Sequence, residues 1–195
     1  MTAIGLGWRV HGSSAVLVAV TGPAESAGVV HREVVTLVDG GSRREPYHAA
    51  TAVALDDVPA LIESAREEAT TAAVAAIRAL VSSVGPVAAI GVVGGNRALP
   101  DLPRILAKHA LLHAAERDLF ERAIMDAATR AGLPITAVPA TGKLLDHASE
   151  LLGVDVGASL ARAGKSIGPP WQKEHREAAA AALVALHEMG ADETG

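Results

Sequence analysis

One long helical pattern, at residues 102–131, limits the folds open to this chain. Its sequence is LPRILAKHALLHAAERDLFERAIMDAATRA. Apolar residues recur there at intervals of three and four, which predicts a single helix of about eight turns that ends before Gly132. A helix of this length has to cover its apolar stripe with other elements, so a sheet or further helices must lie beside it. The stripe runs through Ile105, Leu112, Leu119, Ala123 and Ala127.

Three polar side chains, His109, His113 and Glu116, share that stripe. At roughly 100° per residue they fall within an arc of about 60°, so we expect His109 and Glu116 to be largely buried. The spacing favours a buried, hydrogen-bonded cluster. Two other interpretations stay open. The two imidazoles and the carboxylate could together hold one divalent metal ion, or the three groups could line a pocket for a small acidic or nucleotide ligand. A divalent metal is the one cofactor that the sequence suggests.

Five short apolar segments predict the strands of one sheet. Residues 3–9, 15–20 and 29–38 are joined by connections too short for helices, so they form an antiparallel meander. Residues 87–93, VAAIGVV, have the continuous apolar character of a buried parallel strand, and residues 134–138 supply the fifth strand. We expect strand 87–93 to lie parallel to the first strand, because a helix connects it to the meander. The result is an α/β fold with a mixed five-stranded sheet flanked by helices.

Helical patterns and turn residues account for most of the remaining chain. Asp56 or Asp57 is expected to cap a helix that has Pro59 in its first turn and runs to about Ser83. Residues 39–46, DGGSRREP, are expected to form a surface loop. Further helices are predicted at residues 141–152, 154–163 and 172–188.

Composition limits the function classes. With 195 residues, half of them hydrophobic, the chain can bury one full core, so we predict a single domain at residues 1–190 and a frayed tail at 191–195. The absence of cysteine suits a reducing compartment, and no segment has the length of a membrane span, so we expect a soluble, cytoplasmic protein. A net charge of −5 and 2% aromatic residues do not support charge-driven nucleic-acid binding.

The order of these elements resembles the ribonuclease-H-like fold, in particular the branch that contains the Holliday-junction resolvase. Two segments carry the resemblance: the opening IGLGWRVHGSSAVLVAV, with its glycine turn, and the acidic pair of Glu174 and Glu177 in EHREA at the start of the last helix. The segments PYHAA, HAAE and GPPW also resemble those of a bacterial family, a resemblance that does not indicate which activity to expect.

The resemblance implies phosphodiester cleavage with two metal ions, held by carboxylates from the first strand, the end of the fourth strand and the last helix. Gly7 stands where the first aspartate is expected, and the fourth strand carries no acid. Only Glu174 and Glu177 match as catalytic candidates. The chain therefore resembles this superfamily without its standard nuclease acids.

A second group of candidates comes from other segments. Arg9 and His11 lie near the first strand turn, and Tyr47 and His48 follow the basic loop. If these four approach the long helix, they form an anion-binding set with its histidines; otherwise they are surface side chains without a common pocket. Asn96 joins them as a binding candidate, because Gly94-Gly95-Asn96 follows a strand, where backbone amides often meet phosphate.

The sequence itself identifies no substrate and no partner. The leading hypothesis is a domain that binds a ligand or partner through the cleft beside the long helix. One alternative is a metal-dependent nuclease or phosphodiesterase that uses Glu174, Glu177 and the histidines. A third is a structural subunit of a homo-oligomer, because the helices carry many small residues.

Overall fold

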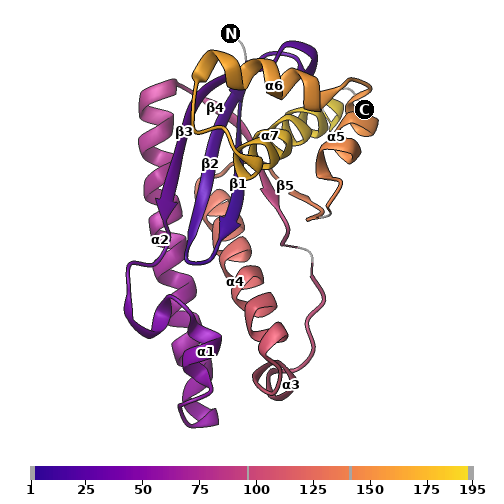
Figure 1. Ribbon diagram of the computed structural model, residues 1–195. Helices are drawn as coiled ribbons and strands as arrows, with labels where there is room; N and C mark the ends of the chain where they lie inside the picture. The colour runs from indigo at the N-terminus through magenta and orange to yellow at the C-terminus, as the bar shows by residue number, and fades with distance from the viewer. Residues whose placement is uncertain (1–2, 96, 141, 193–195) are drawn as a thin grey trace.

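The computed structural model describes residues 3–95, 97–140 and 142–192. Its centre is a five-stranded sheet in the order β3-β2-β1-β4-β5, with helices on both faces (Figure 1). The strands are β1 (Ile4–His11), β2 (Ser14–Thr21), β3 (Gly28–Thr36), β4 (Val87–Val93) and β5 (Ile135–Val138). β1, β2 and β3 pair antiparallel, whereas β4 pairs parallel with β1 and with β5. The predicted mixed sheet and its strand directions are thus confirmed.

The helices form two layers, each with its own core. α2 (Val58–Val84) and α4 (His109–Arg130) pack together behind the sheet, over side chains such as Trp8 and Phe120. α7 (Lys173–Asp192) covers the opposite face, with α5 (Leu144–Leu152) and α6 (Val156–Ile167) beside it. α2 and α4 extend past the end of the sheet, where the short helices α1 (Pro46–Ala50) and α3 (Leu102–Leu106) join them (Figure 1). Short 3-10 turns lie at Ala24–Ser26, Gly41–Arg43 and Leu55–Asp57.

The prediction of one continuous helix over residues 102–131 is wrong. Lys108 has an extended backbone and separates α3 from α4. Asp101 caps α3 by accepting a hydrogen bond from the Arg104 amide, and the Lys108 carbonyl accepts the first hydrogen bonds of α4. The break lets Ile105, Leu112 and Ala115 form a small core of their own, against which Tyr47 packs. Tertiary packing has therefore overridden a pattern that local propensity alone would continue.

The break also changes the surroundings of His109. As the first residue of α4 it is exposed, so the expectation that it is buried is wrong. Glu116, two turns further along α4, is only 7% exposed, as predicted. The polar cluster consequently lies where α4 leaves the core, with Glu116 at its base and the imidazoles toward solvent.

Smaller differences concern the ends of elements. Pro46 begins α1 instead of ending a loop, because a proline suits the first turn of a helix. α6 continues to Ile167 and α7 to Asp192, beyond the predicted ends at residues 163 and 188. In the described part of the chain, no helix is long and apolar enough to cross a membrane.

α7 lies unusually close to the sheet. A Cβ atom on Gly7 of β1 would stand 1.7 Å from the carbonyl oxygen of Ala178, and one on Gly91 of β4 would stand 2.0 Å from that of Ala181. Only glycine permits this approach, and the alanines of α7 complete it with small side chains. The backbone of α7 thus occupies the space over the middle strands.

Candidate functional site

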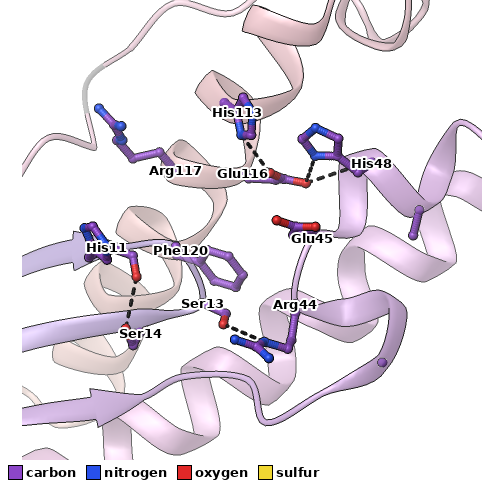
Figure 2. A pocket seen from close by; sticks show the side chains of 13 residues that line it. His11, Ser13, Ser14, Arg44, Glu45, His48, His113, Glu116, Arg117 and Phe120 are labelled. Atoms are coloured by element: carbon purple, nitrogen blue, oxygen red, sulfur yellow. Dashed lines mark hydrogen bonds and ion pairs between the residues drawn. The ribbon is translucent and has the colours of Figure 1, made fainter.

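A cavity lies in the layer opposite α7, beside α4. It has a volume of about 1050 Å³ and is enclosed by the β1–β2 hairpin, the segment that leads into α1, and the first half of α4 (Figure 2). The β1–β2 hairpin forms one polar side of the cavity. Gly12, with a φ of +58°, turns the chain between the two strands. The lining residues are His11, Gly12, Ser13, Ser14, Gly41, Arg44, Glu45, His48, Ala49, His113, Glu116, Arg117 and Phe120.

Glu116 links α4 to α1 at one side of this cavity. Its Oε1 accepts hydrogen bonds from the backbone amide of His48, at 3.1 Å, and from the His48 ring nitrogen Nδ1, at 2.8 Å. Its Oε2 lies 3.7 Å from Nδ1 of His113, one helical turn away. Figure 2 shows the carboxylate between these two imidazoles. A buried carboxylate requires such partners, and Glu116 has them from two separate elements.

Three imidazoles gather above Glu116. The ring centroids of His48 and His113 are 4.6 Å apart, those of His109 and His113 also 4.6 Å, and those of His48 and His109 5.2 Å. One potential ligand nitrogen from each ring lies within 4.8 Å of the other two. His109 and His113 reach this arrangement because residues four apart share a helix face. His48 therefore joins His109 and His113, the two histidines expected from the sequence, and Glu116 contacts the cluster from its buried side.

Two arginines complete the polar lining, and neither was among the candidates from the sequence. Arg44 donates from Nε to Ser13 Oγ at 3.2 Å, which fixes its guanidinium against the hairpin. Arg117 follows Glu116 on α4 and is exposed. They lie on different sides of the cavity (Figure 2). Arg44 belongs to the basic loop, which was a weak signal, whereas nothing in the sequence singles out Arg117.

The other candidates are dispersed. Tyr47 packs against the small core at the start of α4, where burial, followed by the nearby Asp118 charge, raises the pKa of its hydroxyl. Arg9 lies in the other layer, where its Nε donates to Glu177 Oε2 at 2.7 Å. Asn96 falls outside the described residues. Of the four residues from the strand turn and the basic loop, only His11 and His48 line the cavity.

The two acidic candidates on α7, Glu174 and Glu177, lie in its first turns. Glu177 is paired with Arg9 and has Lys173 Nζ at 3.6 Å from its other oxygen, so cations already surround it. Glu174 shares the first turn of α7, where the helix dipole favours an acid. Gly7 and β4 offer no carboxylate beside them. The magnesium pair that the fold family implies therefore does not fit the residues present.

Two buried acids of α4, Asp118 and Glu121, were not among the candidates from the sequence. Glu121 of α4 is completely buried and accepts a hydrogen bond from the Gly95 amide at 2.7 Å. Burial raises the pKa of this carboxyl above its ordinary value, although the Gly95 hydrogen bond opposes the shift. A carboxylate within an apolar helix pattern could have been noticed, but Glu121 was not distinguished from the charged residues around it.

The strand order and the helix placement are those of a mixed α/β fold, a five-stranded sheet with helices on both faces. No family model and no curated protein matches the chain. Among solved structures, the chain is similar to RuvC of Thermus thermophilus, once in complex with a Holliday junction substrate and once in a further RuvC structure. In both cases the identity is 16%, the TM-score is 0.49, and the match covers 98% of this chain and 96% of the RuvC chain.

Proposed function

We propose that this protein binds a small anionic ligand in the cavity beside α4 and does not cleave nucleic acid by the two-metal route. The observation that carries the proposal is the convergence of Arg44, Arg117 and three histidines on one cavity. The leading hypothesis from the sequence, a ligand site beside the long helix, agrees with this position. A cytoplasmic location remains part of the proposal.

The free hydrogen-bond donors among the lining residues favour an anion. One oxygen of Glu116 already accepts hydrogen bonds from the backbone amide and the ring of His48. Arg44 uses Nε for Ser13, which leaves its terminal Nη groups to donate to a ligand. Arg117 lines the cavity and forms no ion pair within the described residues. Glu45 is the remaining acid of the cavity.

The size and shape of the cavity suit a small molecule. Its volume of about 1050 Å³ lies at the upper end of small-molecule sites. Phe120 supplies an apolar surface, and the Ser13 and Ser14 hydroxyls supply neutral hydrogen-bonding groups. Guanidinium and imidazole groups around a polar cavity are the usual donors to phosphate and carboxylate. A phosphate-bearing or carboxylate-bearing metabolite therefore fits better than a duplex.

Titration of inorganic phosphate and pyrophosphate, followed by calorimetry and by NMR of the backbone amides, tests this proposal. Arg44→Gln and Arg117→Gln should each weaken binding roughly tenfold, because each removes charge-assisted hydrogen bonds. Arg78→Gln is the matched control, since Arg78 is exposed on α2 and does not line the cavity. Absence of binding at millimolar anion, or equal weakening by the control, would overturn the proposal.

A further inference from the structure

We infer that His48, His109 and His113 bind one divalent transition-metal ion of the zinc class, with Glu116 orienting their rings. The inference goes beyond the proposed anion site and does not depend on it. It assigns a different ligand set from the one suggested by the sequence, because His48 of α1 takes the position that was expected for Glu116. The ligands come from two helices that only the tertiary fold brings together.

The geometry is close to that of a three-histidine site. Nitrogens bound to tetrahedral zinc at about 2.0–2.1 Å lie about 3.3 Å from one another. The ligand nitrogens here lie within 4.8 Å of one another. His109 and His113 are exposed and His48 is half-buried. Small rotations of these rings about their side-chain bonds can therefore bring the nitrogens onto one ion.

Glu116 orients the imidazole rings for metal binding. Its hydrogen bond with Nδ1 of His48 assigns the proton to that nitrogen and leaves Nε2 as a lone-pair ligand. The second carboxylate oxygen lies 3.7 Å from Nδ1 of His113. The backbone amide of His48 holds the carboxylate in place. A buried carboxylate that orients metal-binding imidazoles is a common arrangement in zinc proteins.

The chemistry of the donors selects the kind of metal. Neutral imidazole suits zinc, cobalt, nickel and copper, whereas magnesium prefers oxygen ligands. A bound dication would also balance the buried charge of Glu116. Three protein ligands leave a fourth position for water or for another ligand. Because His48 and His113 also line the cavity, an ion held by them would lie at its wall.

Titration of the protein, freed of metal by chelation, with Zn²⁺ and with Co²⁺ tests the inference. We expect one ion per chain and, with Co²⁺, the intense visible absorption of a tetrahedral site. His48→Gln, His109→Gln and His113→Gln should each weaken zinc binding at least a hundredfold. Glu116→Leu should weaken it about ten- to a hundredfold. His147→Gln is the matched control, an exposed histidine on α5, and should leave binding unchanged.

Circular dichroism of each variant in chelator verifies that the fold is intact. If the wild-type chain binds zinc no better than the triple His→Gln variant, or if the His147 control weakens binding equally, the inference is overturned. Phosphate titration in chelator separates this result from the anion site. If the wild-type protein binds phosphate but not zinc, the metal site alone is rejected. If it binds zinc but not phosphate, the anion site alone is rejected.

Discussion

The backbone of Gly7 in β1 lies against the carbonyl oxygen of Ala178 in α7, so closely that a Cβ atom at residue 7 would stand 1.7 Å from that oxygen. The helix backbone fills the space that any side chain at this position needs. A carboxylate at residue 7 therefore requires a different position of α7, so a substitution at residue 7 cannot place one there by itself.

Gly7→Ala should lower the free energy of unfolding by more than about 3 kcal/mol, because overpacking against rigid backbone has no soft side chain to displace. Gly7→Asp should be worse and should not create nuclease activity. Gly40→Ala is the control, since nothing lies within 4 Å of a Cβ atom there, and its effect should stay within about 0.5 kcal/mol. Urea unfolding measures all three variants. A stable Gly7→Ala protein would contradict the close packing.

Glu121 should make the stability of the protein depend on pH. Burial raises the pKa of its carboxyl in the folded protein above the unfolded value. Between these two pKa values the folded state binds more protons, so stability falls as pH rises through that window, and the loss is complete above the folded pKa. Glu121→Gln removes this titrating group. The free energy of unfolding of the variant, relative to that of the wild type, should therefore be higher at pH 8 than at pH 5.

Unfolding in urea at both pH values tests the Glu121 prediction. Glu150→Gln, an exposed substitution of the same kind on α5, should follow the wild-type pH dependence. If Glu121→Gln also follows it, the buried carboxyl does not titrate as described.

Arg32 of β3 holds the turn before α7. Its Nη1 donates to the carbonyl oxygens of Gly168 at 2.7 Å and Pro170 at 2.6 Å, and its Nη2 donates to that of Pro169 at 2.7 Å. Lysine cannot reproduce this fork, so Arg32→Lys should destabilise the protein by about 2 kcal/mol. Arg78→Lys, at an exposed position of α2, should be neutral. Equal melting temperatures for the two variants would show that the turn does not depend on the three guanidinium hydrogen bonds of Arg32.

The fold was largely predictable because its signals are local. The apolar segment at residues 87–93 coincides with β4, and the short connections of the meander leave no alternative to antiparallel pairing. The break at Lys108 was not predictable. Residues 102–131 continue a helical pattern, and only the packing of Ile105 and Leu112 around Tyr47 explains why the helix stops and starts again.

The site was predictable only in part, because only its local relationships can be read from the sequence. His109, His113 and Glu116 share a helix face by spacing alone, which the sequence displays directly. His48 is 68 residues from Glu116 in the chain, and their hydrogen bond depends on how α1 docks beside α4. Arg117 likewise acquires a place in the site only through the cavity that the hairpin and α1 enclose.

The wild-type protein should not cleave branched or duplex DNA with magnesium. Glu177 is mostly buried and forms an ion pair with Arg9, so this carboxylate is already engaged within the protein. Removing one partner of such a pair leaves the other unpaired, so Glu177→Gln should cost about 2 kcal/mol of stability, measured by urea unfolding. Glu174→Gln, one turn away in α7, is the control and should have little effect. Cleavage by the wild type that requires magnesium and disappears in the Glu174→Gln, Glu177→Gln double variant would contradict this prediction and favour the nuclease alternative.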